Sequence, residues 1–182
     1  MDMFVGINIF LLWLAITFNL LLSLAILRRL NNSLNTQQTK LPEMLPVGTN
    51  TPNYQLETID GKLTKSQHFA GKEYVLIFLS PYCPACSEQI PRLKQLIPAS
   101  KAANIEMVLV SLGPVVETKE YFSAYEFESS VYIAPPATNN MNQDFKYPLT
   151  PSYYFIDKTG KIKACGLFDS SWSELTSSWS SA

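Results

Sequence analysis

The sequence is poor in cysteine, histidine and net charge. It has 3 cysteines and 1 histidine in 182 residues, and its formal net charge is -1. So few cysteines exclude a small domain held together by several disulfides. The balanced charge provides no basic surface for a polyanion, so we expect no nucleic-acid partner. Where cysteines do occur close together, we therefore expect a functional site and not a structural disulfide.

Charge is also missing from the N-terminal segment. Residues 3–27 contain no Asp, Glu, Lys or Arg and consist mostly of Leu, Ile and Phe. About 20 helical residues cross the hydrocarbon core of a membrane, so this run is long enough to span one. A cleaved signal peptide would have a basic start, a shorter apolar core and a small-x-small cleavage site. The run has none of these, which predicts an uncleaved transmembrane anchor over residues 1–30, with the membrane contacted by residues 3–27.

The residues after this run bear on orientation and domain limits. Arg28 and Arg29 follow the span, and the positive-inside rule would place the rest of the chain in the cytoplasm. Two arginines at a helix end can also reach the headgroups at either face. Residues 31–46 are polar with two prolines, which is typical of a helix end followed by a linker. Residues 47–182 are then expected to form one globular domain.

Hydrophobic periodicity predicts the elements of that domain. We expect a hairpin over 53–63 with a turn at Asp60-Gly61, buried strands over 74–80 and 105–112, and helices over 84–103 and 115–127. A turn-rich segment over 134–148, a hairpin over 152–168 and a last helix capped by Ser170 or Ser171 should follow. A strand–helix–strand unit pairs its strands in parallel, and hairpins add antiparallel strands. The order predicts an α/β fold, with a mixed central sheet and helices on both faces.

Cys83 and Cys86 form a C-x-x-C motif at the junction of a predicted strand and helix. The free N–H groups and the partial positive charge at a helix N-terminus stabilise a thiolate, which is the reactive form of cysteine. Pro84 suits the first turn of a helix. Cys86 lies one turn further and can close a disulfide with Cys83. We therefore predict Cys83 as the attacking cysteine and Cys86 as the resolving cysteine.

Two other interpretations of the pair are weaker. A zinc site needs about four ligands, but only Cys165 and His68 remain, and they form no second paired motif. We therefore expect no metal. Inert core cysteines do not explain the position at a strand–helix junction. Cys165 is interpreted as a buried small residue of the last strand, with a third redox cysteine as the alternative, and His68 as a residue without a catalytic part.

Four segments of the sequence match the pattern of one known protein family. One is YVLIFLSPYCPACSEQIPRL, where Pro91 stands in the helix five residues after Cys86, and another is YPLTPSYYFIDKTGKI, which contains Thr150-Pro151. The others are PNYQLETIDGK with the following QHFAGK, and the N-terminal apolar run. Over residues 46–180 the chain resembles the thioredoxin superfamily, within its membrane-tethered TlpA/ResA/MauD type. SPYCPAC and GKIKACGLFDSSWSEL are most similar to the MauD proteins, which assist maturation of methylamine dehydrogenase.

The resemblance implies a thioredoxin-like fold and a thiol–disulfide oxidoreductase. It implies a cis Thr150–Pro151 bond facing the cysteines, with Thr150, Pro151 and Tyr82 contacting the substrate, and structural roles near the site for Pro84 and Pro91. The redox group would be the Cys83–Cys86 disulfide itself, without a further cofactor. The expected partners are a cysteine-containing protein and an upstream redox protein. The domain would lie outside the cytoplasm and act in maturation or disulfide formation of a partner there.

The sequence departs from the pattern in its acidic residues. The position of the buried thioredoxin Asp, six residues before the first cysteine, is Ile77, and the position of the ResA Glu is Gln89. Tyr82 replaces the usual Trp. The group that handles the proton of Cys86 is therefore not identified. A non-enzymatic assembly factor stays open as an alternative, as does a copper-delivery protein, although the latter would use C-x-x-x-C and a distant His.

Overall fold

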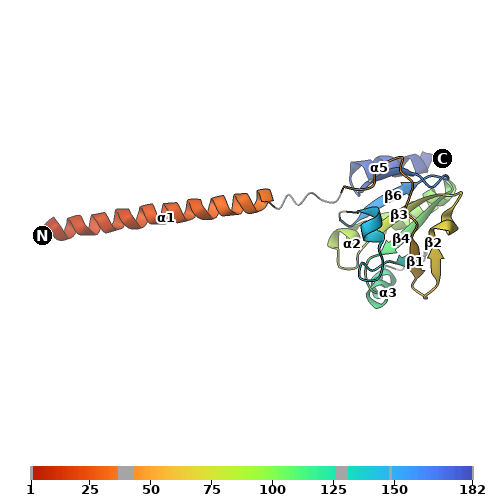
Figure 1. The fold of residues 1–182 in the computed structure, drawn as a ribbon, viewed down its shortest axis with the longest axis horizontal. Helices are drawn as coiled ribbons and strands as arrows, with labels where there is room; N and C mark the ends of the chain where they lie inside the picture. Colours follow the sequence, from red (N-terminus) through yellow and green to blue (C-terminus); the bar gives the residue numbers. More distant parts are fainter. Residues whose placement is uncertain (1, 37–42, 126–130, 148, 182) are drawn as a thin grey trace. The chain divides into compact units, whose positions relative to one another are not determined.

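The computed structural model describes residues 2–36, 43–125, 131–147 and 149–181. The chain divides into two compact units, Met1–Leu41 and Pro42–Ala182. The first unit consists of one long helix, α1 (Asp2–Thr36), drawn in red and orange in Figure 1. Its segment Gly6–Arg28 is long and apolar enough to cross a membrane, and none of it is buried. The helix continues past residue 30, so residues 31–36 are its polar end.

The second unit contains the remaining helices and strands. The strands are β1 (Gln55–Thr58), β2 (Leu63–Lys65), β3 (Glu73–Leu79), β4 (Ile105–Ser111), β5 (Val131–Ile133), β6 (Ser152–Ile156) and β7 (Ile162–Leu167). The α-helices are α2 (Pro84–Ala102), α3 (Val115–Ala124), α4 (Met141–Phe145) and α5 (Ser170–Ser177), with 3-10 helices η1 (Ser66–Phe69) and η2 (Ser178–Ser181). Both predicted hairpins and both predicted buried strands are therefore confirmed.

The strands form one 7-stranded sheet in the order β2-β1-β5-β4-β3-β6-β7. β3, β4 and β5 are parallel, because α2 and α3 connect them as crossovers. The two hairpins add antiparallel strands at the edges, with β6 beside β3 and β1 beside β5. In Figure 1, β4, β3 and β6 lie next to one another in the sheet, in agreement with this order. The predicted mixed sheet is confirmed.

Side chains alternate between two hydrophobic cores, one on each face of the sheet. We call them the first core, which contains Phe78 and receives Phe69 of η1 and Phe145 of α4, and the second core, which contains Ile77 and receives Ile90 of α2. Helices α3 and α5 also contribute to the second core. Helices therefore cover both faces, as predicted, and β3 is buried on both sides because its residues from Tyr74 to Leu79 point alternately into the two cores.

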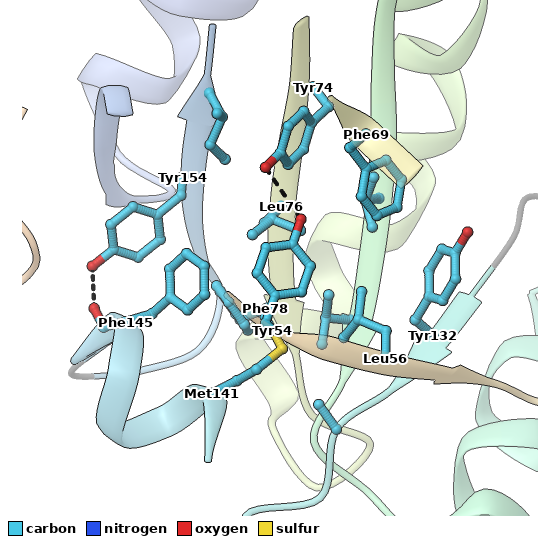
Figure 2. Packing of buried hydrophobic residues seen from close by; sticks show 14 of the residues in the cluster. Tyr54, Leu56, Phe69, Tyr74, Leu76, Phe78, Tyr132, Met141, Phe145 and Tyr154 are labelled. Carbon is cyan, nitrogen blue, oxygen red and sulfur yellow. Dashed lines mark hydrogen bonds between the residues drawn. The ribbon is translucent and has the colours of Figure 1, made fainter. Parts of the chain in front are cut away.

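The first core is rich in aromatic rings (Figure 2). Tyr54 donates a hydrogen bond of 3.2 Å to the hydroxyl of Tyr74, and Tyr154 donates to the backbone carbonyl of Phe145. The backbone N–H of Leu45 donates to the Tyr154 hydroxyl over 3.0 Å. Met44 and Leu45 also pack against this core, although the sequence places them in the linker. Each buried phenol named here thus has a partner for its hydroxyl.

Some elements differ from the prediction. β5 is not predicted, and α4 lies inside the segment expected to consist of turns. The cap of α5 is Asp169, whose carboxylate accepts a hydrogen bond from the Ser171 N–H, so the prediction of Ser170 or Ser171 is wrong. A charged carboxylate one residue earlier satisfies the free N–H groups of the first turn. α3 ends at Ala124, and the predicted extension to Phe127 lies outside the described residues.

Candidate active site

The C-x-x-C pair lies where β3 leaves the sheet. After Leu79 the loop of Ser80 to Tyr82 leads to Cys83, which is the N-cap residue of α2 with an extended backbone. Pro84 takes the first helical position, where its missing N–H costs nothing. The carbonyl of Cys83 accepts hydrogen bonds from the N–H groups of Cys86 and Ser87. The helix continues through Pro91, so Pro84 and Pro91, for which we expect structural roles, both lie in α2.

The thiol of Cys83 is partly exposed and faces backbone groups. Its Sγ donates a hydrogen bond of 3.3 Å to the carbonyl oxygen of Thr150. Partial burial raises the pKa of Cys83, but hydrogen bonds from the Cys86 thiol and from the N–H groups of Ala85 and Cys86 outweigh it, so the pKa lies below its usual value. These N–H groups belong to the first turn of α2, whose N-terminus favours negative charge. Cys83 is therefore set up to react as a thiolate.

The thiol of Cys86 is in the opposite situation. Cys86 is 0% exposed and belongs to the second core together with Ile90 and Leu93. Burial raises the pKa of Cys86 to about 12, and the negative charge of the Cys83 thiolate adds to this increase. Cys86 therefore stays protonated while Cys83 ionises. Unequal thiols of this kind can form and resolve a mixed disulfide in two ordered steps.

The Thr150–Pro151 bond is cis, as the sequence predicts, and the loop that carries it faces Cys83. Leu149, which precedes Thr150, and Tyr82, which precedes Cys83, are strongly exposed, at 51% and 68%. The phenol of Tyr82 is slightly desolvated and interacts with the Glu117 carboxylate, and both effects raise its pKa. Exposed, mostly apolar side chains thus adjoin Cys83 and Thr150 in the chain, and we call Tyr82 and Leu149 the rim.

The loop after β4 supports the loop before Cys83. Gly113 lies so close to Pro81 that an added Cβ would be 2.5 Å from a carbon of the proline ring. Ser111 and Thr118 hold the Gly113 loop, since their hydroxyls are 2.6 Å apart and Thr118 also donates to the Gly113 carbonyl. The position of the active-site loop therefore depends on a glycine that the motif does not include.

No acid is found beside Cys86 among the described residues. Ile77 is fully buried in the second core, and Glu88 is exposed on α2. The buried polar side chains in the described ranges are Ser100, Ser111, Thr118, Ser152 and Thr176. The protic pair next to the cysteines is instead Ser87 and Tyr121, whose hydroxyls are 3.2 Å apart. Sequence spacing could not identify Tyr121, because it is brought to the site by the packing of α3 against α2.

Cys165 and His68 lie away from the pair. Cys165 is half-buried in β7 and packs against the first core, on the other face of the sheet from Cys86. Its Sγ donates to the carbonyl of Leu45 over 3.4 Å, and burial raises its pKa. His68 is exposed in η1, with its ring edge toward Phe69. In the described ranges, no group of three or more His, Cys, Asp or Glu side chains could hold a metal ion.

Solved structures show which class of fold this is. The thioredoxin domain of a thiol-disulfide oxidoreductase from Bacteroides vulgatus matches 74% of this chain and 98% of its own, with a TM-score of 0.65 and 17% identity. A secreted Mycobacterium tuberculosis disulfide oxidoreductase homologous to E. coli DsbE matches 71% of this chain and 96% of its own, with a TM-score of 0.58 and 20% identity. The fold is thioredoxin-like.

The chain belongs to the AhpC/TSA family, whose model matches residues 47–165. The thiol-disulfide oxidoreductase ResA of Bacillus thuringiensis subsp. konkukian is 23% identical over 121 residues, which cover 66% of this chain and 69% of ResA. The methylamine utilization protein MauD of Methylophilus methylotrophus is 23% identical over 123 residues, which cover 66% of this chain and 56% of MauD. The chain is thus a homologue of thiol–disulfide oxidoreductases with a C-x-x-C pair, which confirms the predicted enzyme class.

Proposed function

We propose that the chain is a membrane-tethered thiol–disulfide oxidoreductase that exchanges a dithiol for a disulfide with a partner protein. The observation that carries the proposal is the unequal placement of two cysteines on one helical turn. Cys83 is accessible, has a lowered pKa and faces N–H groups of the first turn of α2, whereas Cys86 is fully buried with a raised pKa. Nucleophile and resolving thiol are thereby distinguished before any partner binds.

The two thiols themselves carry the change of oxidation state. The Cys83 thiolate attacks a partner disulfide, whose S–S bond breaks, and one partner sulfur leaves as a thiolate and takes up a proton. Cys86 then loses its proton and attacks Cys83 Sγ, which releases the second partner thiolate. Two electrons pass to the partner, and the chain is left with a Cys83–Cys86 disulfide. With a dithiol partner the same steps run in reverse.

The partner contacts the rim around Cys83. Thr150 and Pro151 would present backbone beside the thiol, so that an extended partner segment pairs there as an added strand. Tyr82 supplies exposed aromatic surface next to it. A second, upstream redox protein with its own cysteine pair returns Cys83 and Cys86 after each cycle to the redox state that they had before the exchange.

We place the catalytic unit outside the cytoplasm, anchored by residues 3–27. Support comes from the apolar segment Gly6–Arg28 of α1 and from the resemblance to membrane-tethered redox proteins whose domains face that side. The pair Arg28-Arg29 favours the opposite orientation by the positive-inside rule. A C-terminal alkaline phosphatase fusion should be active, and a matched fluorescent protein that folds only in the cytoplasm should be dark. The reverse pattern would overturn the placement.

The similarity to MauD suggests the process. We propose that the partner is a cysteine-rich protein outside the cytoplasm, which acquires or corrects its disulfides through this chain during maturation. An accessible thiol in an apolar rim suits such a partner, because a protein that is still folding exposes apolar segments around its cysteines.

A trapping experiment tests the exchange. The full-length Cys86→Ser variant in detergent, mixed with an unfolded protein that carries a disulfide, should keep a covalent adduct on Cys83, because the resolving thiol is absent. Cys83→Ser should form no adduct, and Cys165→Ser combined with Cys86→Ser should form as much as Cys86→Ser alone. A scaffold without redox activity would form no adduct at Cys83, and this result would overturn the proposal.

A further inference from the structure

Helix α3 brings a phenol to the residue that follows the cysteine pair. Tyr121 of α3 and Ser87 of α2 place their hydroxyl oxygens 3.2 Å apart, and Ser87 directly follows Cys86 in the helix. Tyr121 and Cys83 both pack against the second core, to which Cys86 belongs. The phenol is thus fixed from two sides, by packing of its ring and by a hydrogen bond at its oxygen.

The resolving thiol needs a group of this kind. For Cys86 to attack, it must become a thiolate in a site where it is 0% exposed, and a buried charge is costly unless polar groups stabilise it. Ile77 and Gln89 stand at the positions where the family resemblance implies an acid. Neither of these side chains carries a charge.

We propose that Tyr121, held in place by Ser87, is a positioning residue that supports ionisation of Cys86 during resolution of the mixed disulfide. The inference rests on the proposed function, since it concerns the second step of that reaction. Tyr121 does not take the proton. Its neutral hydroxyl provides a dipole that stabilises the thiolate at the buried face of the pair.

The protonation state of Tyr121 fits the role of a neutral hydroxyl that stabilises the Cys86 thiolate. Burial raises the pKa of Tyr121 to about 12, and the negative charges of the Cys86 and Cys83 thiolates add to the increase. Tyr121 therefore keeps its proton across the range in which thiols react. When Ser87 is the donor in their shared hydrogen bond, the phenol proton is left to turn toward negative charge on Cys86.

Few other titratable or charged groups lie near the Tyr121 hydroxyl in the described part of the chain. The charges that act on the Tyr121 phenol come from the Cys83 and Cys86 thiols at the start of α2 and from Tyr125, which follows the last residue of α3. Lys94 of α2 reaches the backbone carbonyl of Tyr125 over 2.9 Å from the exposed side. No carboxyl group is among these four residues.

A chromogenic aromatic disulfide separates the two steps. The reduced full-length chain in detergent releases one coloured thiolate when Cys83 attacks and a second when Cys86 attacks Cys83 Sγ. Loss of the phenol in Tyr121→Phe should raise the pKa of Cys86. A rise of one unit lowers the thiolate fraction about tenfold but increases its intrinsic nucleophilicity about threefold. The second phase should therefore slow by about threefold and its pH profile should move to higher pH, with the first phase unchanged.

Tyr125→Phe is the matched control, because it removes the same atom from the residue that caps the C-terminus of α3. Ser87→Ala should slow the second phase in the same direction as Tyr121→Phe, and it carries the test if Tyr121→Phe fails to fold. A second phase in Tyr121→Phe, or in Ser87→Ala, that keeps the rate and pH profile of Tyr125→Phe would overturn this inference alone. A wild-type chain that releases no second thiolate would overturn the proposed function and this inference with it.

Discussion

The Sγ atom of Cys83 lies 3.3 Å from the carbonyl oxygen of Thr150, which comes 67 residues later in the chain. The contact joins the first turn of α2 to the loop that enters β6. It places the accessible thiol against the backbone that the proposal assigns to partner binding. Reaction at Cys83 and docking at Thr150 can therefore occur at one place, while Cys86 remains buried behind them.

The two active-site thiols should differ sharply in alkylation. Cys83 should react with iodoacetamide at a lower pH than an ordinary cysteine, because hydrogen bonds lower its pKa, whereas Cys86 should stay unmodified in the folded chain below its pKa of about 12. Mass spectrometry of peptides from the full-length chain, alkylated over a pH series, measures both. Equal rates at Cys83 and Cys86 would contradict the assignment of attacking and resolving thiol.

Gly113→Ala should damage the active site from a distance. The new methyl group would lie 2.5 and 2.8 Å from two carbons of the Pro81 ring, so the loop before Cys83 has to move. We expect a loss of about 1–3 kcal/mol in unfolding free energy and slower mixed-disulfide formation. Gly166→Ala, whose methyl group would come no closer than 3.4 Å to other atoms, is the control. Similar losses in both variants would show that the Pro81 contact has no special part.

Tyr54→Phe should destabilise the first core by about 1 kcal/mol, because it removes the hydrogen bond to Tyr74 from a buried site. The variant should also change the response to alkali. Burial raises the pKa of both phenols above the value near 10 of an unfolded chain, so stability is present below that pH and is lost as the pH rises above it. Thermal unfolding of the full-length chain between neutral and alkaline pH should show a smaller alkaline loss in the variant. An unchanged alkaline loss would contradict this account.

Asp169→Ala should cost about 1 kcal/mol by removing the cap of α5, where the carboxylate accepts hydrogen bonds from Ser171. The Ser171 side chain and N–H lower the pKa of Asp169. A lowered pKa stabilises the fold above the unfolded value near 3.9, and the stabilisation is lost as the pH falls through the folded value.

Asp169→Asn is the control, because an asparagine can cap the helix without a charge. It should keep most of the stability at neutral pH and lose the acid-dependent part. Thermal unfolding followed by circular dichroism between neutral and acid pH compares the three chains. An identical acid response in all three would contradict the capping argument.

Long or strongly patterned elements could be predicted from the sequence. β3 and β4 are runs of apolar residues bounded by breaks, and the hairpins carry Asp60-Gly61 and Lys158-Thr159-Gly160 at turns where Gly61 and Gly160 have positive φ. The position of the C-x-x-C pair at a helix N-terminus was predictable for the same local reason, because a strand before the motif and Pro84 within it indicate where the helix begins. The cis bond at Thr150–Pro151 followed from family resemblance.

Features that depend on tertiary packing could not be predicted. β5 has 3 residues and α4 has 5, so neither is long enough to show a period. Tyr121 reaches Ser87, which follows Cys86, only because α3 packs beside α2, and no spacing in the sequence links these residues. The contact of Gly113 with Pro81 likewise joins the loops after β3 and β4, which become neighbours only in the folded sheet.

The most direct test of the central claim is the redox equilibrium of the full-length chain in glutathione buffers of graded potential. The account predicts one reversible transition between about -270 and -120 mV, in which Cys83 and Cys86 together gain a disulfide while Cys165 remains a thiol by mass spectrometry. A chain whose Cys83 and Cys86 stay reduced across that range, or whose disulfide involves Cys165, would contradict it.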